Sequence, residues 1–303
     1  MSSVVILAHP ARPEATQLAE QTAAWLRGEG HHCRLLVIAG PELVNEDGHI
    51  IEMGALDLRG ADLAISLGGD GTFLRLMNLA YAADIPIVGV NFGRLGYLLE
   101  VDPKELETAL RLAFDGGLRL VARMAIAVSV DGSLQITDPT DRSLQAPGGG
   151  PQGRWWLALN EMVAEKTVPG HMVRLATAID GEEFLTYAAD GVLVATPTGS
   201  TAYNLSAGGP VLAPELEGLI LTPVAPHLSI DRSVVLGPEQ TVTVTVLEER
   251  PAVLVIDGRE VGRRSPGAAI SCQRAHRPVQ FLTLGGRGFA GRLRSTLMLD
   301  RER

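Results

Sequence analysis

Cysteine is scarce in this chain, which contains two residues, Cys33 and Cys272, far apart in the sequence. Such a pair supplies neither a disulfide framework nor the spacing of a metal-binding motif. We expect both to be small core residues of a protein that folds in a reducing compartment. The sequence thus argues against a secreted fold that depends on disulfide bonds.

The chain also lacks long apolar runs and carries fewer positive than negative charges. No apolar stretch reaches the roughly 18 residues that span a bilayer, and residues 1–8 lack the basic start of a secretion signal. The 26 lysines and arginines are outnumbered by 35 aspartates and glutamates, so the formal net charge is −9. An acidic chain is a poor partner for nucleic acid. We therefore expect a cytoplasmic protein that binds neither membranes nor nucleic acid.

What is present is typical of a globular protein, because 303 residues with 46% hydrophobic and 20% charged content suffice for two domains. The first third alternates apolar strand-like runs with segments of helical spacing. Strands are expected at 4–8, 33–38, 61–67 and 85–90, and helices at 14–28, 73–83 and 104–114. Nearly continuous apolar strands separated by helices predict a parallel sheet covered on both faces.

The pattern changes after residue 120, where short, β-branched segments bounded by turns take over. They lie at 122–130, 155–166, 173–179, 191–195, 233–237, 241–247, 252–256, 268–271 and 279–284. This spacing predicts an all-β second domain, either a sandwich or a layered sheet. The expected fold class is therefore α/β followed by all-β.

The segment Gly-Gly-Asp-Gly-Thr at 68–72 is the most informative motif. It joins the strand expected at 61–67 to the helix expected at 73–83, a junction where parallel sheets present backbone N–H groups to phosphate. Glycine lets the main chain approach an anion closely. Asp70 is unusual there, because a carboxylate suits holding Mg²⁺ or accepting a proton from a hydroxyl. The alternative is a tight strand–helix turn without chemistry.

A second motif, Thr-Pro-Thr-Gly-Ser-Thr at 196–201, follows the strand expected at 191–195 and precedes a short helix-like piece. Small hydroxyl residues and glycines at such a junction offer many weak, directional contacts, which suit sugar hydroxyls and base edges. Tyr203 adds an aromatic face on which a base could stack. The alternative is a Ser/Thr-rich turn that caps a helix.

Asn160 and Glu161 form a polar pair inside the strand-like run 155–166, and burying such a pair costs free energy, which suggests a purpose. Neighbouring residues of a regular strand point to opposite faces, so at most one should face a given ligand unless the strand is bulged. Exposure on an open sheet face is the alternative. Asp257-Gly258 has the sequence of a simple hairpin turn.

In their order along the chain, and together with Asn-Phe-Gly-Arg-Leu-Gly-Tyr-Leu at 91–98 and Pro226-His227, these motifs resemble the NAD kinase family. The resemblance covers nearly the whole chain. The loop at 68–72 is shared with diacylglycerol and sphingosine kinases, whereas the block at 196–203 and its spacing from Asn160 are highly specific. The resemblance implies a Rossmann-like domain over 1–121 plus about 288–303, and a β-sandwich domain over 122–287.

The family resemblance also implies a reaction. The γ-phosphoryl group of ATP passes, with a divalent cation such as Mg²⁺, to the 2′-hydroxyl of the adenosine ribose of NAD, giving NADP. Family members commonly associate through the β domain, so a homodimer or homotetramer is expected. The sequence leaves open whether polyphosphate replaces ATP and which metal is preferred.

By the same resemblance, individual residues acquire expected roles, with Asp70 as the proton acceptor. The phosphate loop is matched by Gly68, Gly69, Gly71 and Thr72. Groups that hold the NAD are matched by Asn160, Glu161 and Asp190, and the adenine site by Thr201, Tyr203 and Ser206, with His171 lining it. Further positions expected to contact NAD are Asp70, Gly71, Tyr97, Ala188, Ala202, Asn204, Leu205 and Ala225. No metal ligands are assigned.

Three positions depart from the family pattern. Tyr97 stands where Phe is usual and adds a hydroxyl near the NAD site, and Arg259 stands where Gln is frequent, so that contact is not carried over. Ala188 is small where some relatives carry arginine. We hypothesise that the extra room at position 188 makes reduced NADH tolerable as a second substrate.

Two other functions compete with this interpretation. A lipid kinase could use the same Asp-containing loop, but it would need an apolar pocket for acyl chains, and the hydroxyl-rich segment 196–206 favours a nucleotide. A non-catalytic NAD-binding regulator could keep the fold, but it is expected to lose Asp70 or a loop glycine, and all of these are present.

Overall fold

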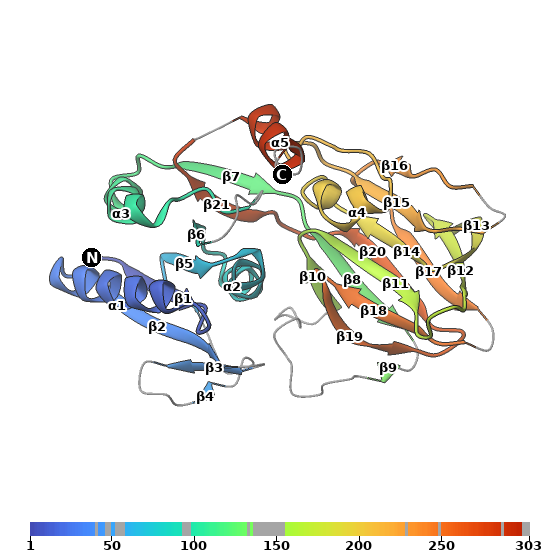
Figure 1. Ribbon diagram of the computed structural model, residues 1–303, viewed down its shortest axis with the longest axis horizontal. Helices are drawn as coiled ribbons and strands as arrows, with labels where there is room; N and C mark the ends of the chain where they lie inside the picture. Colours follow the sequence, from blue (N-terminus) through green and yellow to red (C-terminus); the bar gives the residue numbers. More distant parts are fainter. Residues whose placement is uncertain are drawn as a thin grey trace. The chain divides into compact units, whose positions relative to one another are not determined.

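The computed structural model describes residues 1–39, 42–45, 50–51, 58–92, 98–131, 134–135, 155–227, 230–247, 250–285 and 288–298. The chain divides into two compact units (Figure 1). Of the described residues, the first unit holds those in 1–122 and 279–298, and the second holds those in 123–278. Among the described residues, no helix is long and apolar enough to cross a membrane.

The first unit is built on an eight-stranded sheet in the order β4-β3-β2-β1-β5-β6-β21-β7. Its centre is parallel and consists of β2 (His32–Ala39), β1 (Ser3–Ala8), β5 (Leu63–Gly68), β6 (Ile87–Asn91) and β21 (Val279–Thr283). Antiparallel β3 (Glu42–Asn45) and β4 (Ile50–Ile51) extend one edge, and β7 (Arg119–Arg123) closes the other. The parallel sheet expected from the apolar runs is therefore confirmed.

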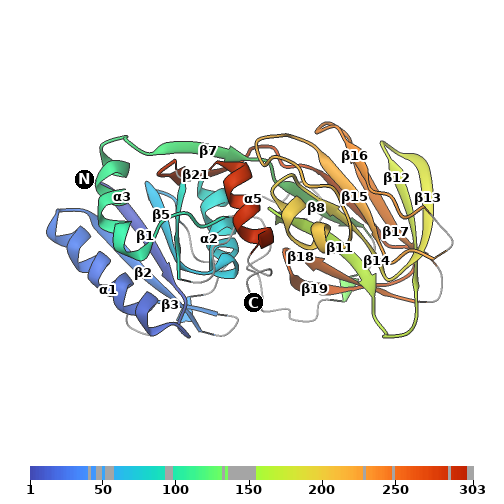
Figure 2. The ribbon, with the colours of Figure 1, turned by 45° about the horizontal axis from the view of Figure 1, so that its top comes forward.

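Helices cover both faces of this sheet (Figure 2). Helices α1 (Pro13–Gly28) and α3 (Leu106–Phe114), the latter preceded by the short turn η1 (Pro103–Glu105), pack on the face that presents Val4 and Ile6. Helix α2 (Asp70–Ala83) packs on the opposite face, where Phe73 meets Phe281 of β21 edge to face at 5.2 Å. Burial on both faces explains why these strands read as continuous apolar runs.

Strand β21 is the clearest departure from the sequence-based expectation in the first unit. The run 279–284 was expected in the β domain, but β21 pairs in parallel with β6, and Phe281 lies opposite Ile87. The run expected at 122–130 is likewise divided, with β7 in this sheet and β8 in the second unit. Alternating apolar residues predict a strand, but they do not say which sheet it joins.

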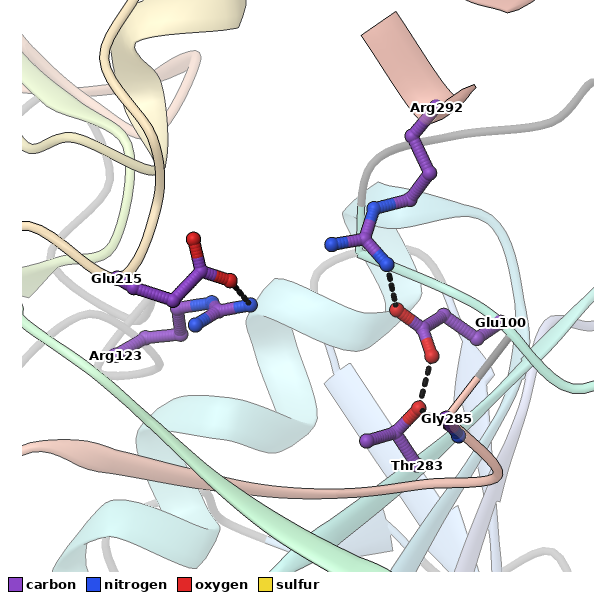
Figure 3. A network of polar contacts seen from close by, with 6 residues as sticks. All are labelled: Glu100, Arg123, Glu215, Thr283, Gly285 and Arg292. Carbon is purple, nitrogen blue, oxygen red and sulfur yellow. Dashed lines mark hydrogen bonds and ion pairs between the residues drawn. The ribbon is translucent and has the colours of Figure 1, made fainter. Parts of the chain in front are cut away.

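Helix α5 (Phe289–Met298) is held to the first unit by a polar network (Figure 3). Arg292 Nη1 lies 2.6 Å from Glu100 Oε1, and the hydroxyl of Thr283 donates to the other oxygen of the same carboxylate. The backbone N–H of Gly285 donates to Thr283 Oγ1 at 3.1 Å. Both charged side chains are mostly buried, 14% and 23% exposed, so solvent screens this pair less than a surface ion pair.

Removing the ion pair between Glu100 and Arg292 is expected to destabilise α5 and to leave the central strands of the sheet unaffected. The substitution Glu100→Gln removes the charge of the Glu100–Arg292 ion pair in a partly buried position, which should cost about 1–2 kcal/mol of local stability. Hydrogen exchange of the peptide 289–298 should speed up in E100Q while β1 and β5 keep their protection. Unchanged exchange of α5 in E100Q would show that the ion pair does not hold the helix.

The second unit contains two antiparallel sheets. The six-stranded sheet is formed by β10 (Trp155–Ala158), β8 (Ile126–Asp131), β20 (Ala269–Arg274), β17 (Val242–Leu247), β12 (Val173–Ile179) and β13 (Glu182–Ala189). The seven-stranded sheet is formed by β16 (Val234–Leu236), β15 (Leu219–Val224), β14 (Gly191–Ala195), β11 (Glu161–Lys166), β18 (Ala252–Ile256), β19 (Arg259–Arg264) and β9 (Leu134–Gln135). Their inner faces share one core, with Leu175 and Val244 from the first sheet and Val194 and Leu254 from the second. This arrangement confirms the β-sandwich.

Within the second unit, the run 155–166 is not one strand. It forms β10 in one sheet and β11 in the other, with a bend at Leu159 and Asn160. The expectation of a single strand is therefore wrong, and the polar pair Asn160 and Glu161 sits where the chain changes sheets. We call residues 159–161 the sheet corner. Arg123, which is 10% exposed, pairs with Glu215 at 3.3 Å elsewhere in this unit (Figure 3).

Candidate functional site

The glycine-rich loop of the first unit lies at the carboxyl edge of the parallel sheet. Strand β5 ends at Gly68, Gly69 caps α2, and the helix begins at Asp70. Neighbouring strands end at the same place, because His9 N–H donates to Leu67 at 3.0 Å and Phe92 N–H donates to Gly68 at 3.1 Å. The strand order reverses between β1 and β5, and open α/β sheets bind ligands beyond the carboxyl ends of the strands at such a reversal.

The three glycines of the loop differ in how much space a side chain would find. A Cβ atom on Gly68 would overlap the side chain of Thr72, so packing alone requires glycine there. A Cβ atom on Gly69 or Gly71 would meet nothing within 4 Å in the described part of the chain. Packing therefore does not require glycine at these two positions, and the absence of a Cβ leaves the N–H groups at the start of α2 accessible.

Asp70 is the one ionisable residue of this loop. Its side chain keeps contact with solvent, while the surrounding protein partly desolvates the carboxyl group and raises its pKa above the usual value. A raised pKa makes an ionised carboxylate a better proton acceptor. Asp70 can therefore take a proton from a group placed at the edge of the sheet.

Arg12 is a neighbour of this loop that the sequence reasoning missed. It is the residue before α1, in the turn that follows β1, and its Nη1 donates to the carbonyl of Phe92. The backbone N–H of Phe92 donates a hydrogen bond to the carbonyl of Gly68, so the Arg12 guanidinium group lies at the same edge of the sheet as the loop. The available signal was an arginine in the first strand–helix turn of an α/β sheet, a place where phosphate is often bound.

In the second unit, the sheet corner packs against the Thr-Pro-Thr-Gly-Ser-Thr segment that follows β14. Thr196 N–H donates to the carbonyl of Asn160 at 2.9 Å, and Thr196 Oγ1 donates to the carbonyl of Leu159 at 2.5 Å. A Cβ atom on Gly199 would overlap the backbone of Asn160. The structure thus brings together two motifs that are well separated in the sequence.

Glu161 is a buried carboxyl group at this corner, 4% exposed. Burial raises its pKa to about 8, the negative charge of Asp257 adds to the shift, and a hydrogen bond from the backbone N–H of Tyr203 opposes it. Its Oε2 has no hydrogen-bond partner among the described residues. At neutral pH the group is therefore mostly protonated and keeps one oxygen for a further contact.

Tyr203 lies among charged side chains of the same unit and is 37% exposed. Burial raises the pKa of its phenol, and so do the charges of Glu165, Asp190 and Glu161. Lys166 pairs with Asp190 at 2.7 Å. The sequence-predicted residues Glu161, Asp190 and Tyr203 are thus gathered, whereas the neighbouring Glu165 and Lys166 were not anticipated, because polar residues at a strand end are common.

The remaining residues predicted to contact NAD differ in location and in burial. Ala188 pairs with His227, whose N–H donates to the Ala188 carbonyl at 2.8 Å, and Ala225 is nearby with a left-handed φ of 46°. His171 is exposed in the turn after β11. Tyr97 lies outside the described residues. The other predicted positions run from Thr201, the last residue of η2 (Gly199–Thr201), through α4 (Tyr203–Ser206). Thr201, Ala202 and Leu205 are half-buried, and Ser206 is exposed.

Asn204 is buried and fully engaged within the unit. Its Nδ2 donates to the carbonyls of Ser200 at 3.2 Å and Pro210 at 3.0 Å, and its Oδ1 accepts from Thr222 Oγ1 at 2.8 Å. A Cβ atom on Gly209 would overlap this amide. The side chain of Asn204 therefore holds the loop together.

Comparison with known proteins also divides the chain into two parts. The model of the ATP-NAD kinase N-terminal domain matches residues 4–118, and the model of the ATP-NAD kinase C-terminal domain matches residues 159–284. The chain belongs to the ATP-NAD kinase family. It is therefore an enzyme of the kinase type, a transferase with NAD kinase activity. Neither the lipid kinase nor the non-catalytic regulator is favoured by this assignment.

Individual relatives span nearly the whole chain. NAD kinase 1 of Streptomyces avermitilis is 34% identical over 99% of this chain and 88% of its own, and NAD kinase of Heliobacterium modesticaldum is 34% identical over 99% and 100%. Yeast NADH kinase, solved with NADH, shares the fold with a TM-score of 0.78 at 20% identity, over 99% of this chain and 88% of its own. The NAD kinase of Archaeoglobus fulgidus, solved with ATP, has a TM-score of 0.70 at 25% identity, over 96% and 99%.

Proposed function

We propose that the chain transfers the γ-phosphoryl group of ATP to the 2′-hydroxyl of the adenosine ribose of NAD, with Asp70 as the proton acceptor. The O–H proton passes to Asp70, the ribose oxygen forms a bond to the γ-phosphorus, and the bond to the β-phosphate oxygen breaks to release ADP. The observation that carries this role is a solvent-accessible carboxylate with a raised pKa at the start of α2. A ribose hydroxyl is a weak nucleophile, so a positioned proton acceptor is worth about 10² to 10⁴-fold.

The donor phosphates are proposed to lie against the N–H groups of residues 69–72. Mg²⁺ usually keeps several waters and binds largely through substrate phosphates, so no residue of this chain is assigned to it, and Asp70 stays free to accept the proton. When bound, the cation would neutralise charge on the phosphates. No cluster of three or more His, Cys, Asp or Glu side chains suited to a metal is found among the described residues.

The NAD is proposed to bind at the sheet corner and the loop after β14. Asn160, Glu161 and Asp190 would hold the ribose and amide groups, and Tyr203 with Thr201 and Ser206 would hold the adenine. A protonated Glu161 can donate a hydrogen bond as well as accept one. The solved relatives with NADH and with ATP support a fold that takes both nucleotides.

A coupled assay for NADP tests this function directly. NADP should form with ATP and a divalent cation, and should not form when the donor is omitted or the cation is chelated. A parallel reaction with polyphosphate decides the donor. Absence of NADP with every donor would refute the proposal. The active form is proposed to be a homodimer or homotetramer, which light scattering measures.

Ala188 is proposed to leave room for the reduced nicotinamide. We expect NADH to be phosphorylated within about tenfold of the rate for NAD, because a methyl side chain excludes less volume than the arginine of some relatives. Ala188→Arg should lower the NADH rate more than the NAD rate. Strict dependence of the unmodified enzyme on NAD would refute this hypothesis.

A further inference from the structure

Asp257 is a buried acidic residue to which the proposed reaction gives no role. With Gly258 it forms the two-residue turn between β18 and β19, and the left-handed φ values of 47° and 75° fit a type I′ hairpin. Hairpin-turn aspartates are ordinarily solvated, yet this residue is 9% exposed. A turn role alone therefore does not explain why the carboxylate points into the protein.

The carboxylate of Asp257 accepts three consecutive backbone N–H groups of the sheet corner. Its Oδ2 accepts from Leu159 at 2.9 Å, and its Oδ1 accepts from Asn160 at 2.7 Å and from Glu161 at 3.1 Å. The N–H of Asp257 donates in return to the Glu161 carbonyl at 3.0 Å. Hydrogen bonds to an ionised acceptor are stronger than neutral ones, so this side chain is a firm anchor for the bend.

The opposite side of the same peptides is also occupied. The carbonyls of Leu159 and Asn160 accept from Thr196, as described above. With the N–H groups held by Asp257 and these carbonyls held by Thr196, the peptide planes at the corner have little freedom to rotate. The directions of the Asn160 and Glu161 side chains follow from those planes.

We propose that Asp257 is a positioning residue for NAD binding, which fixes the side chains of Asn160 and Glu161 without touching the substrate. This inference rests on the proposed role of those two residues as NAD ligands. Charge and shape both matter here, because an asparagine at 257 keeps one oxygen acceptor but turns an N–H group toward the N–H of Leu159.

Two substitutions separate the anchor from the turn. Asp257→Asn tolerates the left-handed backbone and loses part of the anchor, and Asp257→Gly has no steric cost at positive φ and loses all of it. Asp180 offers a matched control. It begins the Asp-Gly turn between β12 and β13, with φ values of 52° and 83°, is exposed, and accepts the N–H of Thr241 at 2.8 Å.

We expect the KM for NAD to rise about tenfold in D257N and about 100-fold in D257G, while the KM for ATP stays within about twofold. D180N and D180G should keep the KM for NAD of the unmodified enzyme. A loss of folded protein would lower the apparent kcat and leave both KM values alone. Folded D257G with an unchanged KM for NAD, or with equal rises for NAD and ATP, would overturn the inference. If D257N fails to fold, D257G decides the matter by the same criteria.

Asn160→Ala and Glu161→Ala, measured in parallel, keep the inference and the proposed function distinguishable. If neither raises the KM for NAD, the proposed NAD site is wrong, and the role of Asp257 falls with it. If both raise the KM and the Asp257 variants do not, the NAD site stands and only the positioning role is lost.

Discussion

Asparagine at position 70 is expected to lower kcat for NADP formation by about 10² to 10⁴-fold while the KM for NAD stays within about twofold. The amide has nearly the same shape as the carboxylate and remains at the start of α2, but it cannot accept a proton at neutral pH. Steady-state rates at saturating ATP and NAD measure the effect. A turnover of D70N equal to that of the unmodified enzyme would remove Asp70 from the mechanism.

A matched control for this substitution lies in the same unit. Asp62 is an exposed aspartate that precedes β5 and accepts the N–H of Ser3 at 2.8 Å. Asp62→Asn makes the same chemical change at the opposite end of the same strand, so its kcat should not change. A comparable fall of kcat in D62N would indicate that the D70N result reports general damage to the sheet.

Glutamine at position 161 is expected to stabilise the second unit at alkaline pH. The amide keeps an acceptor for the backbone N–H of Tyr203 and removes a buried group whose ionisation is unfavourable. Glutamine has the shape and the donor and acceptor groups of the neutral form, so the gain in stability reports the ionisation of Glu161 alone.

The pH window for this effect follows from the direction of the shift. The pKa of Glu161 is about 8 in the folded protein against an ordinary value of 4.5, so between these values the folded state binds the proton and the unfolded state does not. Stability is therefore lost as pH rises from about 5 to 9, by about 2–5 kcal/mol in total. Asp257, whose burial raises its pKa to about 6, contributes in the same direction over a lower range.

Denaturant unfolding at pH 6 and pH 9 tests this prediction. E161Q should lose less stability between the two pH values than the unmodified protein, whereas Glu183→Gln, on the exposed end of β13, should behave like the unmodified protein. Identical pH dependence in E161Q and the unmodified protein would show that the Glu161 carboxyl is not held in its neutral form.

The sequence was informative where local pattern and structure coincide. The strands at 4–8 and 61–67 and the helix at 73–83 match β1, β5 and α2 closely, because apolar periodicity and the glycine punctuation act within a few residues. The fold class and the family followed from the same features. Glu161, Asp190 and Tyr203 were selected individually and are found near one another.

The features that the sequence did not predict depend on contacts between residues far apart in the chain. Nothing in the run 155–166 indicates that the chain changes sheets at Asn160, because the bend is fixed by Asp257 from another part of the sequence. Likewise β15 contains Pro223 and β13 begins with two exposed glutamates, so neither has a strong strand pattern, and their pairing is decided by neighbours. The sheet that β21 joins is likewise decided by the strands beside it and not by its own sequence pattern.

A crystal structure with NAD bound tests the central claim most directly, through the distance from the Asp70 carboxylate to the 2′-oxygen of the adenosine ribose. We expect a hydrogen-bond distance, roughly 2.6–3.2 Å. A dinucleotide bound with that oxygen beyond about 6 Å, and with no water to bridge the gap, would contradict the proton-acceptor role and the account built on it.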